Sequence, residues 1–142
     1  MRRLLVLQHL NREGPGLFAH VAKKRGLNVR IFRLDLGDEL PQINKEDLLL
    51  VLGGSMGVKD INTYKYQWLA KEILLIKDAL NKGIGIIGVC LGAQLLSKAV
   101  GGDVEPLLDS ASLLSPEVGW DKIFLASRSC EKIWGSLLDK PL

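Results

Sequence analysis

The stretch IGIIGVCLG, residues 84–92, decides the fold of this chain. Its first six residues are almost continuously apolar, as expected for a strand that is buried on both faces of a parallel sheet. The run ends in the pattern G-x-C-x-G, with Cys90 between Gly88 and Gly92, and residues typical of a helix follow up to Val100. The pattern predicts a strand, a tight turn at Cys90 and a helix, which is the cysteine counterpart of a nucleophile elbow.

Each position of this turn has a physical reason. Side chains two residues before and two residues after the nucleophile would collide, so glycine is expected at Gly88 and Gly92. The helix N-terminus carries a partial positive charge, which favours a thiolate at Cys90 over a thiol. The backbone N–H of Leu91 is then free to face a developing oxyanion. A lone cysteine is more often a buried structural residue, but the two glycines, the strand and the helix together favour the nucleophile.

Outward from this turn, the chain alternates short strands with longer helices, which predicts an α/β fold: a doubly wound, flavodoxin-like, mostly parallel sheet with helices on both faces. We expect one domain over residues 1–142. Weaker patterns place strands at Val104 and residues 123–125 and a short helix over residues 130–138. The expected strands are Leu4–Leu7, Val29–Leu34, Leu48–Leu52 and Ile84–Val89, and the expected helices are Leu17–Arg25 (inner stripe Leu17, Phe18, Val21 and Ala22), Thr63–Lys82 and Leu91–Val100.

A second glycine-rich turn, Gly53-Gly54-Ser55-Met56-Gly57, follows the third expected strand. In open parallel sheets, ligands bind beyond the carboxyl ends of the strands, where this turn and Cys90 both lie. A glycine backbone can approach a ligand closely, so the turn is placed to supply the second half of an oxyanion hole.

The composition is that of a soluble globular domain, with 47% hydrophobic and 25% charged residues and a net charge of +3. Basic residues alternate with acidic ones, so nucleic acid is not an expected partner. No stretch reaches the ~20 apolar residues of a membrane span. The two cysteines, Cys90 and Cys130, have neither metal-site nor disulfide-framework spacing. We expect a cytoplasmic protein without metal or cofactor.

The run from Gly88 to Gln94 closely resembles the C-L-G-x-Q signature of class I glutamine amidotransferases, and the turn from Gly53 to Gly57 resembles their GGP-type oxyanion loop. Glu13-Gly14-Pro15-Gly16 and Glu117-Val118-Gly119-Trp120 are similar to segments of the small stand-alone branch related to the amidotransferase part of GMP synthase.

The resemblance implies a glutamine amidotransferase in which Cys90 attacks the side-chain amide of glutamine, forms a γ-glutamyl thioester and releases ammonia. It implies that the backbone N–H groups of Gly54 and Leu91 hold the oxyanion. Gln94, one helical turn after Cys90, would bind glutamine, together with Gly53, Ser55 and Met56. Ser55 replaces the family's usual proline, which should matter little because the site uses the Gly54 backbone. The implied partners are glutamine and a synthase domain or subunit that accepts the ammonia.

One part of the family pattern has no counterpart in these residues. The family carries a histidine base and an acidic partner, spaced H-x-E, far downstream of the cysteine, whereas the only histidines here are His9 and His20. We therefore expect a C-terminally incomplete domain that is a poor glutaminase alone. His9 lies at the correct edge of the sheet, but in a region where the family keeps no triad member, so both histidines are expected to be structural or solvated.

Two alternatives stay open. One is another cysteine-elbow hydrolase of the same superfamily, such as the intracellular-protease-like and chaperone-like proteins, although Gln94 favours glutamine. The other is a non-catalytic or regulatory module that binds glutamine or a partner without turning it over, which the missing histidine favours.

Overall fold

The computed structural model describes residues 2–116 and residue 119. The chain divides into two compact units, Met1–Glu105 and Pro106–Leu142. The first contains every named helix and strand. In the second, Leu108 and Leu114 form an isolated antiparallel bridge, and the Asp109 carboxylate accepts hydrogen bonds from the N–H groups of Ala111 and Leu113. The single-domain expectation stays a prediction.

The first unit is built on a four-stranded, all-parallel sheet in the order β2-β1-β3-β4. This order is the first part of the flavodoxin-like arrangement, so the predicted fold class is confirmed. The strands are β1 (Arg3–Gln8), β2 (Asn28–Arg33), β3 (Leu48–Val51) and β4 (Gly85–Gly88). Each lies within one or two residues of its predicted bounds.

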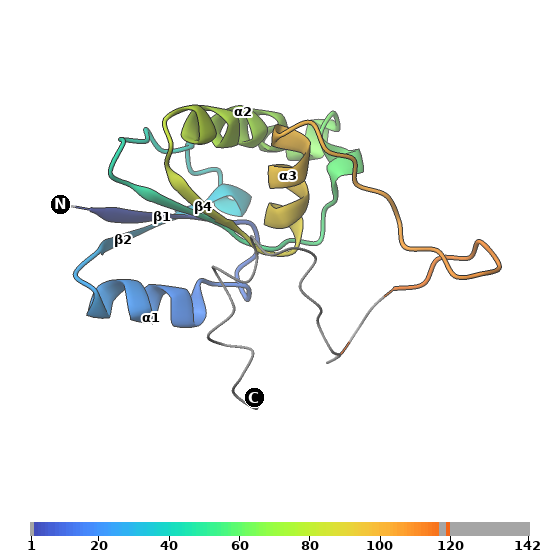
Figure 1. The fold of residues 1–142 in the computed structure, drawn as a ribbon, viewed down its shortest axis with the longest axis horizontal. Helices are drawn as coiled ribbons and strands as arrows, with labels where there is room; N and C mark the ends of the chain where they lie inside the picture. Colours follow the sequence, from blue (N-terminus) through green and yellow to red (C-terminus); the bar gives the residue numbers. More distant parts are fainter. Residues whose placement is uncertain (1, 117–118, 120–142) are drawn as a thin grey trace, which may run out of the picture. The chain divides into compact units, whose positions relative to one another are not determined.

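Helices cover both faces of the sheet (Figure 1). The helix α1 (Gly16–Lys24) lies on one face, and α2 (Trp68–Asn81) and α3 (Leu91–Ala99) lie on the other. Because successive residues of a strand point to opposite faces, β1 and β3 divide their side chains between two cores. The core on the α2 and α3 side includes Leu5, Leu7, Leu49, Val51, Leu69, Ile76 and Leu95, and the core on the α1 side includes Leu4, Val6, Ala22, Leu50 and Leu52.

The two central strands are buried more fully than the two outer ones. Leu5, Val6, Leu50 and Val51 have no exposed side-chain surface, whereas Ile31 of β2 and Ile87 of β4 are about half exposed. The expectation that residues 84–89 form a strand buried on both faces is therefore not met: among the strands of the described chain, β4 is an outer, partly exposed one.

Three other sequence-based expectations need correction. Only Ala22 of the predicted α1 stripe is buried, because Leu17, Phe18 and Val21 lie along an open apolar groove of about 530 Å³ that also includes sheet residues such as Leu50 and Ile87. The helix α2 begins at Trp68 rather than Thr63, since two 3₁₀ turns, Val58–Asp60 and Tyr64–Tyr66, occupy the preceding segment.

Val104, which was expected in a strand, is not in one. It stands between Asp103 and Glu105 with a proline next, so the segment offers neither an apolar run nor a continuous set of backbone donors. The other weak expectations, a strand at residues 123–125 and a helix over residues 130–138, lie outside the described residues.

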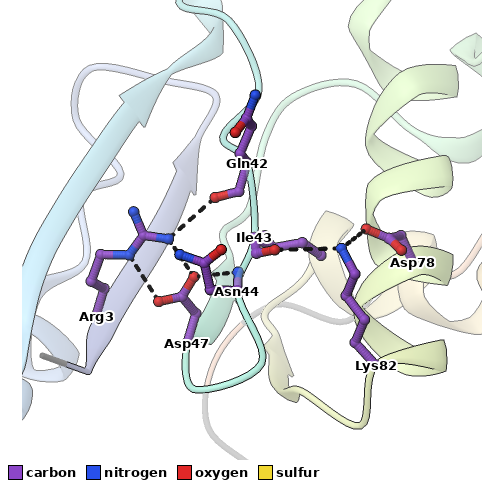
Figure 2. A network of polar contacts seen from close by, with 7 residues as sticks. All are labelled: Arg3, Gln42, Ile43, Asn44, Asp47, Asp78 and Lys82. Carbon is purple, nitrogen blue, oxygen red and sulfur yellow. Dashed lines mark hydrogen bonds and ion pairs between the residues drawn. The ribbon is translucent and has the colours of Figure 1, made fainter.

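A polar network connects the segments at the end of the sheet opposite Cys90, where the strands begin (Figure 2). Arg3, at the start of β1, donates from Nε to Asp47 Oδ1 at 2.8 Å, and the Asn44 N–H donates to Asp47 Oδ2 at 2.7 Å. The hydrogen bond from Arg3 holds the pKa of Asp47 below its usual range. Lys82, at the end of α2, pairs with Asp78 at 2.7 Å and reaches the Ile43 carbonyl at 3.4 Å. The loop before β3 is therefore fixed to both β1 and α2.

Candidate active site

Cys90 lies with Val89 between the end of β4 and the start of α3, and its backbone conformation is unusual. Its φ of 54° and ψ of −112° lie where a residue with a Cβ is strained. The side chain is exposed, and the carbonyl of Cys90 accepts hydrogen bonds from the N–H groups of Ala93 and Gln94 at 3.0 and 3.2 Å. This is the strand–turn–helix geometry that the G-x-C-x-G pattern predicts.

The two elbow glycines are required for different reasons. A Cβ on Gly88 would lie 2.6 Å from the backbone carbon of Gly92, so a side chain there would collide with the first turn of α3. A Cβ on Gly92 would collide with the backbone carbonyl of Val51 in β3. Gly88 thus allows the turn to close, and Gly92 allows α3 to rest directly on the neighbouring strand.

The Gly53–Gly57 loop lies against this turn from the end of β3. A Cβ on Gly53 would lie 3.3 Å from the Cys90 Cβ and 3.8 Å from its sulfur. A Cβ on Gly54 would collide with the Met56 sulfur and would lie 3.1 Å from Leu91 Cδ2. The structure therefore brings together the two segments that were predicted to form an oxyanion hole.

Two backbone N–H groups of this region, those of Gly54 and Leu91, are available as the donors that anion binding needs. Leu91 is the first residue of α3, so its N–H has no partner within the helix. Within the described residues, no backbone carbonyl outside the regular helices and strands accepts a hydrogen bond from the N–H of Gly54 or of Leu91.

The remaining predicted site residues differ in exposure. Gln94 is half-buried in the first turn of α3, and Ser55 is exposed at the tip of the loop. Gly53 is buried, and the Met56 side chain packs into the core beneath Gly54. Only the backbone of Met56 is therefore available for a ligand, while its side chain supports the loop.

Glu13 is a residue that the sequence analysis missed as part of the site. Its Oε2 lies 3.0 Å from the position that a Cβ on Gly53 would take, next to Cys90. The side chain is 41% exposed, and Arg12 Nε lies 4.0 Å from Oε1. A carboxylate in this place puts a negative charge beside the candidate nucleophile. Its position in the loop after β1, at the carboxyl edge of a parallel sheet, is the signal that could have identified it.

Glu72 was also missed as a neighbour of the site, whereas His9 was placed at the correct edge of the sheet without a role in it. Both side chains are completely buried. His9 follows β1, and its Nδ1 lies 3.0 Å from the Gly53 carbonyl oxygen while its Nε2 lies 3.0 Å from Glu72 Oε1 in α2. His20, in contrast, is exposed on α1. Neither histidine presents a free ring nitrogen to Cys90 in the way a general base requires: His9 has both nitrogens occupied, and His20 lies on the helix of the opposite sheet face.

The protonation of His9 follows from its partners. Burial alone would lower the pKa of this imidazole, but the hydrogen bond and the charge of Glu72, with smaller contributions from the carbonyls of Gly53 and Leu52, outweigh it and hold the pKa above its ordinary value of 6.5. Glu72 supplies the hydrogen-bond partner that the buried Nε2 of His9 needs.

Comparison with known proteins identifies the family. The model of the class-I glutamine amidotransferases matches residues 16–128, which is most of the chain. The chain belongs to the class-I glutamine amidotransferase family. The resemblance that the motifs around Cys90 and Gly54 indicated is thereby confirmed.

Two sequence relatives and one solved structure show how much of this chain and of each similar protein the likeness covers. The chain is 36% identical over 81 residues to a glutamine amidotransferase-like protein, L716, of Acanthamoeba polyphaga mimivirus, covering 57% of this chain and 35% of that protein. It is 31% identical over 121 residues to the imidazole glycerol phosphate synthase subunit HisH of Sulfurisphaera tokodaii, covering 74% of this chain and 53% of that one. A crystal structure of a glutamine amidotransferase from Methylobacillus flagellatus superposes with a TM-score of 0.65 at 32% identity, covering 73% of this chain and 41% of that chain.

These three proteins are considerably longer than the matched region. The chain spans between 35% and 53% of their length. Within the described residues, no helix has the length and apolar character needed to cross a bilayer. No group of three His, Cys, Asp or Glu side chains there is placed to hold a metal ion.

Proposed function

We propose that this class-I amidotransferase chain carries the nucleophile and the oxyanion hole of a reaction that releases ammonia from glutamine. The observation that carries the proposal is the strained, exposed Cys90 at the start of α3, with the Gly53–Gly54 loop packed against it. Strain of this kind costs about 1–3 kcal/mol and persists where the surrounding structure imposes it, which is typical of catalytic positions.

In the proposed reaction, the Cys90 sulfur attacks the side-chain amide carbon of glutamine. The carbonyl oxygen gains negative charge, which the N–H groups of Gly54 and Leu91 stabilise. The carbon–nitrogen bond then breaks, the leaving nitrogen takes up a proton as ammonia, and a γ-glutamyl thioester remains on the sulfur. Water hydrolyses this thioester to glutamate and regenerates the thiol.

The substrate contacts of the proposal come from the residues around this centre. Gln94, half-buried one turn after Cys90, would bind the glutamine. Gly53, Ser55 and the backbone of Met56, in the loop after β3, would contact it as well. Glu13 adds a carboxylate beside Cys90, which suits the α-ammonium group of an amino-acid substrate.

A proton carrier is the one component that these residues do not supply. His9 has both ring nitrogens engaged by Gly53 and Glu72. We therefore propose that, in the whole protein, the base is a histidine with an acidic partner, as the family pattern H-x-E implies. One relative is named as a subunit of a synthase, which supports an ammonia-accepting synthase domain or subunit as the partner. More specifically, we propose an acceptor like that of GMP synthase. The proposed location is the cytoplasm.

The engagement of His9 also favours a second function for the chain acting alone, namely binding glutamine without turning it over. The two functions separate in one experiment. The chain is incubated with glutamine, denatured in acid and measured by intact-protein mass spectrometry, while calorimetry measures binding. A glutamyl adduct that is absent in Cys90→Ala supports the amidotransferase. Binding of glutamine without an adduct supports the non-catalytic module, and the absence of both would overturn the proposed function.

A further inference from the structure

One buried histidine connects three separate segments around the candidate site. His9, directly after β1, contacts the Gly53 carbonyl in the loop after β3 and Glu72 in the middle of α2. Both side chains of the pair are completely shielded from solvent. A buried ion pair is generally no more stabilising than well-packed apolar side chains of the same volume, so stability alone does not account for it.

The partners of His9 determine where its protons are. The Gly53 carbonyl can only accept a hydrogen bond, so Nδ1 must carry a hydrogen and donate it at 3.0 Å. Nε2 faces both carboxylate oxygens of Glu72, at 3.0 and 3.2 Å. Whether the second proton lies on Nε2 or on the carboxylate, the donor to Gly53 is therefore present.

The Gly53 carbonyl belongs to the same peptide group as the Gly54 N–H. This peptide bond is trans, as are all peptide bonds of the described chain, so the C=O and the N–H point in opposite directions. With glycine on both sides, the peptide plane could rotate at little steric cost. A carbonyl held by His9 prevents that rotation and directs the Gly54 N–H away from the buried imidazole.

Gly54 is closely packed on the side of the loop that faces His9. A Cβ on Gly54 would lie 3.2 Å from the His9 Cβ and 3.1 Å from Leu91 Cδ2. The exposed Cys90 lies instead against Gly53. Gly54 therefore packs against His9, whereas Gly53 faces the candidate nucleophile Cys90.

We propose that His9, oriented by Glu72, is a positioning residue that fixes the Gly53–Gly54 peptide so that its N–H serves the oxyanion hole of Cys90. This inference rests on the proposed function, because it assigns the loop to that oxyanion hole. The histidine acts through the loop and touches no reacting atom.

Two double variants of the full chain separate positioning from stability. In His9→Asn/Glu72→Gln, the Asn amide places an N–H donor where Nδ1 was, so the hydrogen bond to Gly53 is kept without a buried charge. In His9→Leu/Glu72→Met, apolar packing replaces the pair and the donor is lost. Both avoid the isolated buried charge that a single substitution would leave.

The first measurement needs no activity. With ¹⁵N-glycine labelling, we expect one sharp Gly54 amide resonance in the unchanged chain and in His9→Asn/Glu72→Gln. In His9→Leu/Glu72→Met, we expect the resonance to broaden or split as the peptide rotates. A sharp, unshifted Gly54 signal in a folded His9→Leu/Glu72→Met variant would overturn the inference, whatever becomes of the proposed function.

The second measurement concerns the oxyanion hole. A chloromethyl ketone analogue of glutamine alkylates Cys90 by forming a carbon–sulfur bond and releasing chloride, with its carbonyl in the hole. Methyl methanethiolsulfonate modifies the same sulfur by forming a disulfide and releasing methanesulfinate, without using the hole. The ratio of the two rates should fall about tenfold or more in His9→Leu/Glu72→Met and stay close to that of the unchanged chain in His9→Asn/Glu72→Gln.

The two failures are distinguishable. If the unchanged chain reacts no faster with the glutamine analogue than with chloroacetone, the proposed function fails, and the inference that His9 serves it fails with it. If the unchanged chain prefers the analogue and both double variants keep that preference, only the inference about His9 is overturned.

Discussion

Gly92, in the first turn of α3, lies so close to the carbonyl of Val51 in β3 that no side chain fits between them. We expect Gly92→Ala to destabilise the chain by about 3 kcal/mol, because the obstacle is the backbone of a central strand, which cannot move aside. Gly57→Ala is the matched control, since Gly57 has an extended backbone and no heavy atom within 4 Å of its would-be Cβ. Urea unfolding monitored by circular dichroism measures both variants, and equal midpoints would contradict the close packing of Gly92 against Val51.

The strain at Cys90 should be visible in stability. A φ of 54° with ψ of −112° suits glycine but not residues with a Cβ. We expect Cys90→Gly to be more stable than Cys90→Ala by about 1 kcal/mol or more, since only glycine relieves the strain. Thermal unfolding of the two variants checks this; an alanine variant as stable as the glycine variant would show that position 90 is unstrained.

Cys90 should be the more reactive of the two thiols. It is exposed on the strained turn between β4 and α3, between the two elbow glycines, whereas no G-x-C-x-G pattern surrounds Cys130. Brief treatment with iodoacetamide followed by peptide mapping should find label first at Cys90. Cys130→Ser serves as the control and should label at an unchanged rate; faster labelling of Cys130 would reverse the assignment.

Glu13 should influence which reagents reach Cys90. Its carboxylate lies beside Gly53 and the Cys90 sulfur, so it should repel anions. In Glu13→Gln, we expect the rate ratio of anionic iodoacetate to neutral iodoacetamide to rise about threefold at low ionic strength. The ratio cancels changes in the thiol itself. Glu46→Gln, which removes an exposed carboxylate from the loop before β3, should leave the ratio unchanged.

The His9–Glu72 pair should make stability depend on pH. Because the folded-state pKa of His9 is raised above its ordinary value of 6.5, mainly by Glu72 against the effect of burial, its contribution is fully present below 6.5 and is lost as the pH rises through the folded-state pKa. Asp35 is a further charge coupled to His9 within the described residues, and its pKa is lowered chiefly by Arg33 and in small part by His9. The free energy of unfolding should therefore decline above pH 6.5 in the unchanged chain and decline less in His9→Asn/Glu72→Gln. Parallel pH profiles would contradict the charged pair.

The sequence predicted the sheet well because the central strands are apolar on both faces. Residues 4–7 and 48–52 read as buried strands and are buried except for the half-buried Leu48, and the glycine pattern around Cys90 located the elbow. The α1 stripe misled because amphipathic spacing shows that a helix has an apolar face, not that the described chain covers it; Leu17 is 79% exposed.

The link between His9 and Glu72 could not be predicted from local pattern, because 63 residues separate them. One signal was nevertheless present. Glu72 stands three residues after Leu69 and four before Ile76, so it occupies the buried face of α2, where an acidic side chain requires a partner. A histidine at the end of a central strand was the available partner, but only the register of α2 against the sheet shows that the two meet.

The unusual backbone at Cys90 has a consequence for how such sequences change over time. A chain selected only for folding would gain stability by exchanging this residue for glycine, and the exchange needs no compensating change elsewhere. Keeping a side chain at position 90 therefore costs folding stability that glycine would restore. Descendants that lose the need for the thiol should accumulate glycine at position 90, which would make this one codon a record of whether the chemistry is still in use.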